Sequence, residues 1–317
     1  MGYGMTVPFD DIPLSAHRDW YEQLVDLGYT DVWSSEAEGT DGFTPLALAA
    51  AWAPTLRVGT AIVSAFTRGP SLLAQSAAAM AEAAPGRFAL GVGSSSDVIV
   101  EQWNGIPFDE PYRRTRDVVR FLRLALTGER VDEAFDTFTV KGFRLARPPE
   151  IVPPILVAAL RPGMLRLAGR ESDGAIINWL GAEDVTRVVA EVGPGREIVA
   201  RILVFPSEDI ATVRAVARRR IAAYLNVPVY TAFHEWLGRG PLLEGMWAAW
   251  KAGDRRAALE AIPDEVVDDL VIHGSPAQVR AGIQRYMDNG VTTPALAIVS
   301  TGVDLRQAVR DLAPSAG

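Results

Sequence analysis

The 317-residue sequence contains no cysteine and only three histidines, His17, His234 and His273. Without cysteine the chain can form no disulfide, no thiolate nucleophile and no cysteine-ligated metal centre. Three histidines so far apart in the sequence also give no pattern typical of a zinc or iron centre. We therefore expect a protein without a metal site.

Long apolar runs and a basic surplus are missing as well. No run reaches the ~18 apolar residues that a membrane-spanning helix needs. The net charge of −8 argues against a nucleic-acid surface. The first residues lack the basic and apolar regions of a signal peptide. We expect a soluble, cytoplasmic protein that binds neither nucleic acid nor membranes.

The sequence does have a large apolar content, arranged in a regular alternation. Hydrophobic residues make up 49% of the chain and charged residues 22%, which is enough for an extensive core. Short apolar runs without polar alternation are typical of parallel strands that are buried on both faces. They predict strands at 1–8, 31–35, 58–64, 88–92, 155–159, 174–179, 198–205 and 295–300. The helical patterns between them lie at 14–27, 43–53, 71–84, 111–126, 162–169, 183–192, 210–225, 276–289 and 305–312.

Eight strand–helix units predict a (β/α)8 TIM barrel of the α/β class, in a single domain over residues 1–317. A doubly wound open sheet is the alternative, although no G-x-G-x-x-G motif occurs at a strand-to-helix turn. Two segments interrupt the alternation. Lys141-Gly142, between residues 136–140 and 143–145, predicts the turn of a small hairpin before strand five. Residues 226–273 predict an insertion of two or three helices, without a strand, between strands seven and eight.

Chemistry in such a barrel is expected where the carboxyl ends of the strands open into loops. Glu36 follows strand two and is either a buried acid or a solvated loop carboxylate. Gly91-Val-Gly-Ser-Ser-Ser offers backbone N–H groups and hydroxyls to an anion, or is a flexible turn. In Ala159-Leu-Arg-Pro-Gly-Met, Pro162 fits the first turn of a helix and Arg161 adds a positive charge. That combination predicts a phosphate cradle, with a surface arginine as the alternative.

The remaining candidates are weaker. His17 is predicted inside an early helix, on the side of the barrel away from the chemistry. His234 lies in the helical insertion and is either a substrate contact or a core residue. The tryptophans at 236, 247 and 250 are predicted to pack helices together. No Ser–His–Asp set, paired carboxylates or phosphate-binding loop motif is present, so we expect a cofactor to supply the reactivity.

Several segments in the same order along the chain carry a family resemblance. They are Gly28-Tyr-Thr-Asp-Val-Trp-Ser-Ser-Glu, Leu56-Arg-Val-Gly-Thr-Ala-Ile-Val-Ser-Ala-Phe-Thr-Arg-Gly-Pro, Pro85-Gly-Arg-Phe-Ala-Leu-Gly-Val-Gly-Ser-Ser-Ser, Pro154-Ile-Leu-Val-Ala-Ala-Leu-Arg-Pro and Gly274-Ser-Pro-Ala-Gln-Val-Arg. With them the chain resembles the bacterial luciferase-like monooxygenase superfamily, in the branch of oxidoreductases that depend on coenzyme F420, a 5-deazaflavin.

The resemblance implies a cofactor that lies across the carboxyl ends of the barrel strands. It also implies a non-prolyl cis peptide at the end of strand three, which here would be Ala61–Ile62. A hydroxyl near the polar edge of the ring would be Ser64, and the serine-rich turn and the start of the fifth helix would hold the ring and the phosphate. The predicted cofactor-binding residues are Ala61, Ile62, Ser64, Gly91, Gly93, Ser94, Ser95, Ala159, Leu160, Arg161, Pro162, Gly163 and Asn178.

Two positions depart from the relatives that oxidise alcohols or sugar phosphates. This chain has Ala37 where they carry a histidine and Ser96 where they carry a glutamate. Glu36 and Ser96 are therefore the candidates for moving a proton. We expect hydride transfer between F420 and a small organic substrate, in a homodimer. The alternatives are an FMN-dependent monooxygenase that uses O2 and a non-catalytic flavin or deazaflavin binder.

Overall fold

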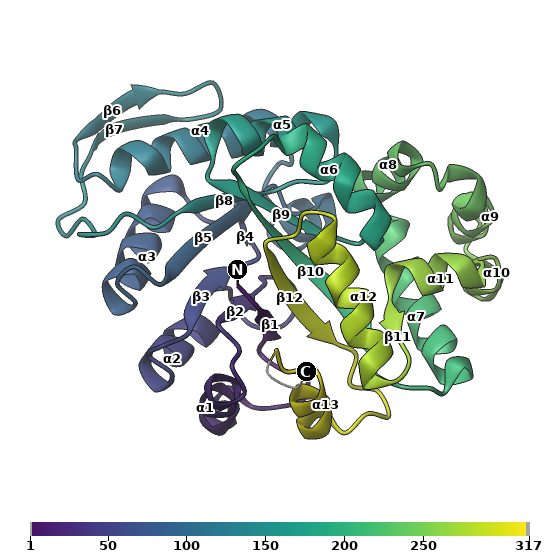
Figure 1. Cartoon of the computed structure of the whole chain (residues 1–317). Helices are drawn as coiled ribbons and strands as arrows, with labels where there is room; N and C mark the ends of the chain where they lie inside the picture. The colour runs from purple at the N-terminus through teal and green to yellow at the C-terminus, as the bar shows by residue number, and fades with distance from the viewer. Residues whose placement is uncertain (1, 315–317) are drawn as a thin grey trace.

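The computed structural model describes residues 2–314, and strands between residues 4 and 298 form a closed parallel barrel (Figure 1). In order around the barrel they are β1 (Gly4–Val7), β2 (Asp31–Ser34), β3 (Arg57–Thr60), β5 (Phe88–Gly93), β8 (Ile155–Ala158), β9 (Gly174–Asn178), β10 (Glu197–Phe205) and β12 (Thr293–Ile298). β12 pairs with β1 and closes the ring. The predicted barrel is confirmed, and the closure excludes the open sheet.

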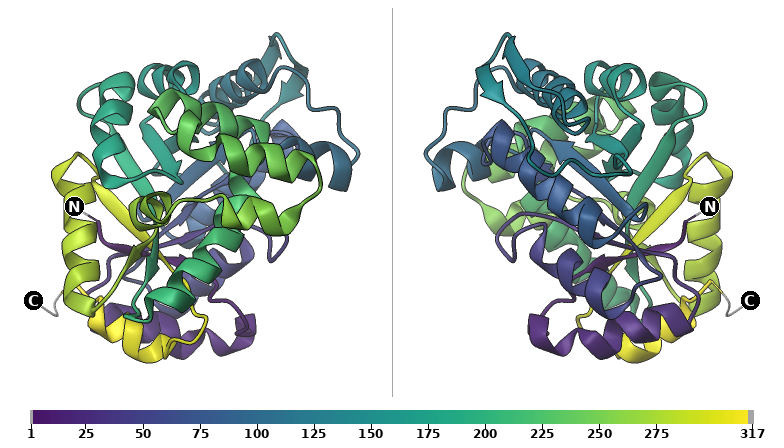
Figure 2. Two further views of the ribbon diagram at one scale, coloured as in Figure 1. Left: turned by 90° about the vertical axis from the view of Figure 1, so that its right-hand side faces the viewer. Right: turned by 90° about the vertical axis from the view of Figure 1, so that its left-hand side faces the viewer.

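Helices surround the barrel on the outside (Figure 2). They are α1 (Arg18–Asp26), α2 (Thr44–Trp52), α3 (Pro70–Ala83), α4 (Pro111–Ala125), α5 (Pro162–Glu171), α6 (Val185–Val192), α7 (Ile210–Leu225), α12 (Pro276–Asp288) and α13 (Leu305–Asp311). Short helical turns are η1 (Leu14–Ala16), η2 (Val98–Trp103) and η3 (Ala182–Asp184). Proline stands at the first position of α3, α4, α5 and α12, where its missing N–H breaks no helical hydrogen bond.

The barrel interior is filled by one apolar layer with a charged layer beneath it. The apolar layer contains Trp33, Ala89, Leu156, Ile176, Val199 and Ala295. Trp33 occupies space that Gly59 leaves free, since a Cβ added at Gly59 would lie 2.2 Å from the indole ring. At the amino ends of the strands, Arg57 donates to both carboxylate oxygens of Glu197, at 2.5 and 2.8 Å, and to Asp31 at 3.4 Å.

The predicted hairpin is present, but its turn was placed wrongly. β6 (Val131–Ala134) pairs with β7 (Thr139–Phe143) in antiparallel fashion, so Lys141-Gly142 lies inside a strand. The turn is at 135–138, because Asp117 of α4 accepts hydrogen bonds there from the N–H and the hydroxyl of Thr137, at 2.9 and 3.0 Å.

The insertion also differs from its prediction in detail. Residues 226–273 contain four helices, α8 (Pro228–Leu237), α9 (Gly240–Lys251), α10 (Arg255–Glu260) and α11 (Asp264–Leu270), where two or three were expected. Gly238 and Gly253 adopt φ angles of 93° and 83° and divide the helices. The segment also ends in a short strand, β11 (Ile272–His273), which pairs with β10. In Figure 1 the insertion lies at the right of the molecule, beyond α6, α7 and α12.

Strand three is divided where the sequence predicts one continuous strand. β3 ends at Thr60, and β4 (Val63–Ser64) resumes the pairing with β5. The Ala61–Ile62 peptide bond between them is cis, at the position that the family resemblance implies. In residues 2–314, no helix is long and apolar enough to cross a membrane.

Candidate active site at the mouth of the barrel

The ends of β3 and β5 form a surface of small residues at the carboxyl end of the barrel. Ala61 and Ile62 are half-buried, and the carbonyl of Ile62 accepts a hydrogen bond from the Glu36 N–H at 3.1 Å. Gly93 packs directly beside them, because a Cβ there would lie 2.8 Å from the Cβ of Ala158 and 3.2 Å from the Ile62 side chain. The glycine therefore lets β5 approach its neighbours closely.

Glu36 is not a solvated loop carboxylate. Its Oε1 pairs with Nη2 of Arg68 at 2.6 Å, and both side chains are about one-fifth exposed. The other carboxylate oxygen, Oε2, and the Nε of Arg68 are buried without a hydrogen-bond partner among the described residues. The Arg68 guanidinium lies over the ring of Phe43, 5.0 Å from its centroid. Glu36 thus keeps one oxygen free beside the small-residue surface.

The serine-rich turn follows β5 and stays partly accessible. Ser95 adopts a φ of 64°, and the Ser96 hydroxyl accepts a hydrogen bond from the Ile99 N–H at 3.3 Å where η2 begins. Ser94 donates to the Ser95 carbonyl, also at 3.3 Å. The turn therefore places three serines at the mouth, with Ser96 also capping a helical turn.

Four predicted cofactor residues are buried, namely Ser64, Gly91, Gly93 and Ala159, and two of them have their polar groups occupied within the chain. The N–H and carbonyl of Gly91 are both bonded to the Thr60 hydroxyl, at 2.8 and 2.9 Å. The buried Ser64 hydroxyl accepts a hydrogen bond from the Phe66 N–H at 3.1 Å. Because these polar groups already form hydrogen bonds inside the chain, they fix the backbone at the strand ends.

The start of α5 opens to solvent at the same end of the barrel. Ala159 is buried and donates to the Ile176 carbonyl at 3.0 Å, whereas Leu160 and Pro162 are half-buried and Arg161 and Gly163 are exposed. The first helical hydrogen bond runs from Leu165 to the Arg161 carbonyl at 2.9 Å. The N–H groups before it are free for an anion. A Cβ added at Gly163 would meet nothing within 4 Å, so this cradle has room.

A third part of the mouth was missed by sequence reasoning. Arg201 of β10 is paired in register with Asn178 of β9, and both point into the barrel one step above the apolar layer that contains Val199. Asn178 donates to the Tyr230 hydroxyl of α8 at 3.4 Å. A charged residue inside the otherwise apolar run 198–205 was the available signal.

His17 and His234 are buried, and the tryptophans of the insertion pack against the hydrophobic core. The placement of His17 inside a helix was wrong: it precedes α1, is buried, and its Nε2 accepts a hydrogen bond from the Phe9 N–H at 2.9 Å. His234 is also buried, and burial together with Arg239 lowers its pKa to about 3. Trp247 donates to the Leu225 carbonyl at 2.9 Å and joins α9 to α7. Residues 2–314 contain no cluster of three or more metal-binding side chains.

The sequence matches the family described as luciferase-like monooxygenase over residues 1–293. The chain belongs to that family. Among curated proteins, this luciferase-like chain is 29% identical to a Mycobacterium tuberculosis protein that is provisionally named a coenzyme F420-dependent oxidoreductase, over 95% of this chain and 94% of the relative. It is 27% identical to the 5,10-methylenetetrahydromethanopterin reductase of Methanolobus tindarius, over 90% of each.

Solved structures share the same fold. The coenzyme F420-dependent tetrahydromethanopterin reductase of Methanopyrus kandleri superposes with a TM-score of 0.80 at 19% identity, over 99% of this chain and 97% of the other. The FMN-bound oxygenating constituent of 3,6-diketocamphane monooxygenase from Pseudomonas putida gives 0.67 at 17% identity, over 100% and 98%. The luciferase-like barrel is therefore shared by enzymes of both cofactor types.

Proposed function

We propose that this luciferase-like protein is an oxidoreductase that transfers a hydride between coenzyme F420 and a small organic substrate. The observation that carries the proposal is the similarity, along nearly the whole chain, to a relative named for F420 dependence. The mouth of the barrel fits such a cofactor, since it combines a small-residue surface, N–H groups at a helix start beside a guanidinium, and a buried carboxylate oxygen that has no partner within residues 2–314.

Each part of the mouth has its own role in this proposal. Arg161 and the first turn of α5, from Leu160 to Gly163, hold the cofactor phosphate, because a helix N-terminus and a guanidinium both favour an anion. Ala61, Ile62 and Gly93 form the surface beneath the ring, with Ser94, Ser95 and Asn178 at its edges. The bound deazaflavin supplies the carbon that accepts or donates the hydride.

Glu36 is the proposed proton-transfer residue. Oε1 of Glu36 is held in the ion pair with Arg68, and the other oxygen, Oε2, accepts or returns the proton that accompanies hydride transfer. Ser96 is the second candidate for proton transfer at this edge, although its hydroxyl already accepts a hydrogen bond at the start of η2. The remaining predicted residues, Ser64, Gly91 and Ala159, keep the strand ends in place.

Titration of the purified full chain with F420 and, separately, with FMN tests the cofactor, with cofactor fluorescence as the readout. We expect micromolar or tighter binding of F420. Arg161→Gln should weaken it about tenfold, the loss of one charged hydrogen bond. Arg166→Gln is the matched control, because Arg166 is an exposed residue of α5 that pairs with Glu191 of α6, and this change should leave F420 binding unchanged.

Binding of FMN without F420 would overturn the proposal in favour of an oxygen-dependent monooxygenase. Binding of F420 without turnover of any substrate would favour a non-catalytic binder. The proposed homodimer is tested independently by light scattering of the same preparation.

A further inference from the structure

Arg201 is a cation inside the barrel that forms no ion pair within residues 2–314. Its side chain is partly buried, its Nε is fully buried without a partner, and it forms no ion pair or hydrogen bond with any residue from 2 to 314. Burial lowers its pKa, because desolvation disfavours the charged guanidinium. A partly desolvated guanidinium whose Nε has no partner among residues 2–314 is costly to retain, so its place inside a barrel strand indicates a ligand that pairs with it.

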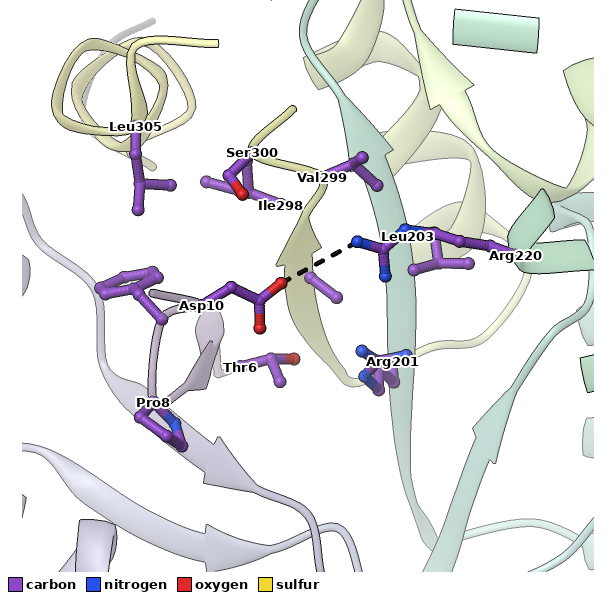
Figure 3. A pocket seen from close by; sticks show the side chains of 12 residues that line it. Thr6, Pro8, Asp10, Arg201, Leu203, Arg220, Ile298, Val299, Ser300 and Leu305 are labelled. Atoms are coloured by element: carbon purple, nitrogen blue, oxygen red, sulfur yellow. Dashed lines mark ion pairs between the residues drawn. The ribbon is translucent and has the colours of Figure 1, made fainter. Parts of the chain in front are cut away.

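The surroundings of Arg201 form a pocket that is open at the barrel mouth (Figure 3). Figure 3 shows the guanidinium groups of Arg201 and Arg220 on one side of it and Thr6 and Asp10 on the other. Its lining residues are Thr6, Pro8, Phe9, Asp10, Arg201, Leu203, Arg220, Ala297, Ile298, Val299, Ser300 and Leu305.

The charges of this pocket leave a positive surplus. Among the described lining residues, Arg220 and Asp10 form an ion pair. Nη2 of Arg220 lies 3.9 Å from Oδ2 of Asp10, which is too far for a hydrogen bond. Asp10 also attracts Arg201, from beyond ion-pair distance, and Arg220 repels it, so one carboxylate faces two guanidinium groups. The Thr6 hydroxyl is buried and lacks a partner in the described chain, so it is free to donate to a ligand oxygen.

The pocket lies across the mouth from the proposed cofactor cradle. Its lining comes from β1, β10 and β12, from the loops after β1 and β12, and from α7 and the start of α13. The proposed cofactor site is built at the ends of β3, β5 and β8. In the closed strand order these two groups are separated by β2 on one side and by β9 on the other. A molecule in the pocket would therefore face the ring without occupying the phosphate cradle.

We infer that this pocket binds an oxyanion carried by the substrate, a carboxylate or a phosphate, with Arg201 as its anchor. The planar guanidinium donates two parallel hydrogen bonds to such a group. Arg220 adds charge at the rim, and the Thr6 hydroxyl contacts a further oxygen. This inference specifies the class of substrate for the proposed function. Anion binding stands on the pocket alone, whereas the hydride transfer that follows rests on the proposed function.

Calorimetric titration of the full chain, with and without F420, tests the pocket directly. The probes are butyrate, its neutral isostere butyramide, and inorganic phosphate. We expect butyrate or phosphate to bind and butyramide not to bind. Arg201→Gln should weaken anion binding about 10- to 100-fold, the loss of a charged hydrogen-bond pair. Arg219→Gln removes an exposed arginine of α7, leaves the pocket intact, and should bind like the parent chain.

The possible outcomes separate the two proposals. Preference for butyrate indicates a carboxylate substrate, and preference for phosphate indicates a phosphorylated one. The inference is overturned if Arg201→Gln and the parent bind the anion with equal affinity. It is also overturned if the parent binds no anion, with or without F420, and F420 binding is then judged separately. Anion binding that depends on Arg201 in a chain that fails to bind F420 would retain the site and reject the F420 proposal.

Discussion

At the scale of single residues, Glu36 offers the sharpest test of the proposed chemistry. Glu36→Gln keeps an oxygen that can accept a hydrogen bond from Arg68, but its amide cannot take up or release a proton as a general acid or base. We expect F420 binding to be unchanged and kcat to fall about 10²- to 10⁴-fold, the usual range for removal of a general acid–base. Fluorescence titration measures F420 binding, and steady-state kinetics with the first substrate that is turned over with F420 measures kcat.

Asp41→Asn is the matched control, since Asp41 lies 3.7 Å from the same Arg68 and is more exposed. Its kcat should remain near the parent value. An unchanged kcat in Glu36→Gln would contradict proton transfer by Glu36 and leave it only the role of orienting Arg68.

Residue identities at the mouth could be predicted from the sequence wherever they follow a strand. Glu36, Ser96 and Arg161 each come directly after an apolar run, so their place at the mouth follows from the parallel sheet. Arg201 could not be found in that way, because it lies within a strand. Its inward direction depends on the register with Asn178, and register is a long-range property.

At the scale of elements, local sequence patterns predict the strands and helices, but they do not predict the contacts between elements that are distant in the sequence. The eight predicted strands all exist, and α3 and α4 begin within one residue of the prediction because Pro70 and Pro111 start them. The hairpin turn was misplaced because Asp117, which holds it, belongs to a helix twenty residues earlier in the chain. No local pattern at Lys141-Gly142 reveals that contact.

Asp117→Ala should therefore loosen the hairpin without opening the barrel. It removes the acceptor for both the N–H and the hydroxyl of Thr137, groups that then lack a partner, at a cost of about 1–3 kcal/mol. Hydrogen–deuterium exchange should accelerate over residues 131–143 and stay unchanged in β1 and β12. Asp136→Ala removes an exposed carboxylate from the same turn and should have little effect. Equal exchange in the Asp117 variant and the parent would contradict this account.

At the scale of the whole molecule, the barrel is held at its amino end by charges from distant parts of the chain. Asp31 begins β2, Arg57 begins β3 and Glu197 begins β10, and their side chains meet inside the ring. The sequence shows only three charged residues at three strand starts. Their contact requires that the sheet be closed, so closure and the charge cluster could not be predicted separately. A substitution in this cluster therefore tests how strongly it stabilises the closed barrel.

Arg57→Gln should destabilise the whole fold by about 3 kcal/mol, because it leaves two largely buried carboxylates without their cation. Urea unfolding measures the change, with Arg18→Gln, which breaks an exposed pair, as a control of about 0.5 kcal/mol or less.

The same variant should show a distinctive pH dependence. Burial raises the pKa of Asp31, so the folded chain takes up this proton at a higher pH than the unfolded chain. The stability that the proton contributes is complete below the usual aspartate pKa and is lost as the pH rises through the raised value. Because Arg57 holds that pKa down, its removal raises the pKa further, and the deficit of Arg57→Gln should be smaller at pH 5 than at pH 7. Adding Asp31→Asn should reduce both the deficit and its pH dependence. A deficit equal at both pH values would show that Asp31 is not the group that loses its partner.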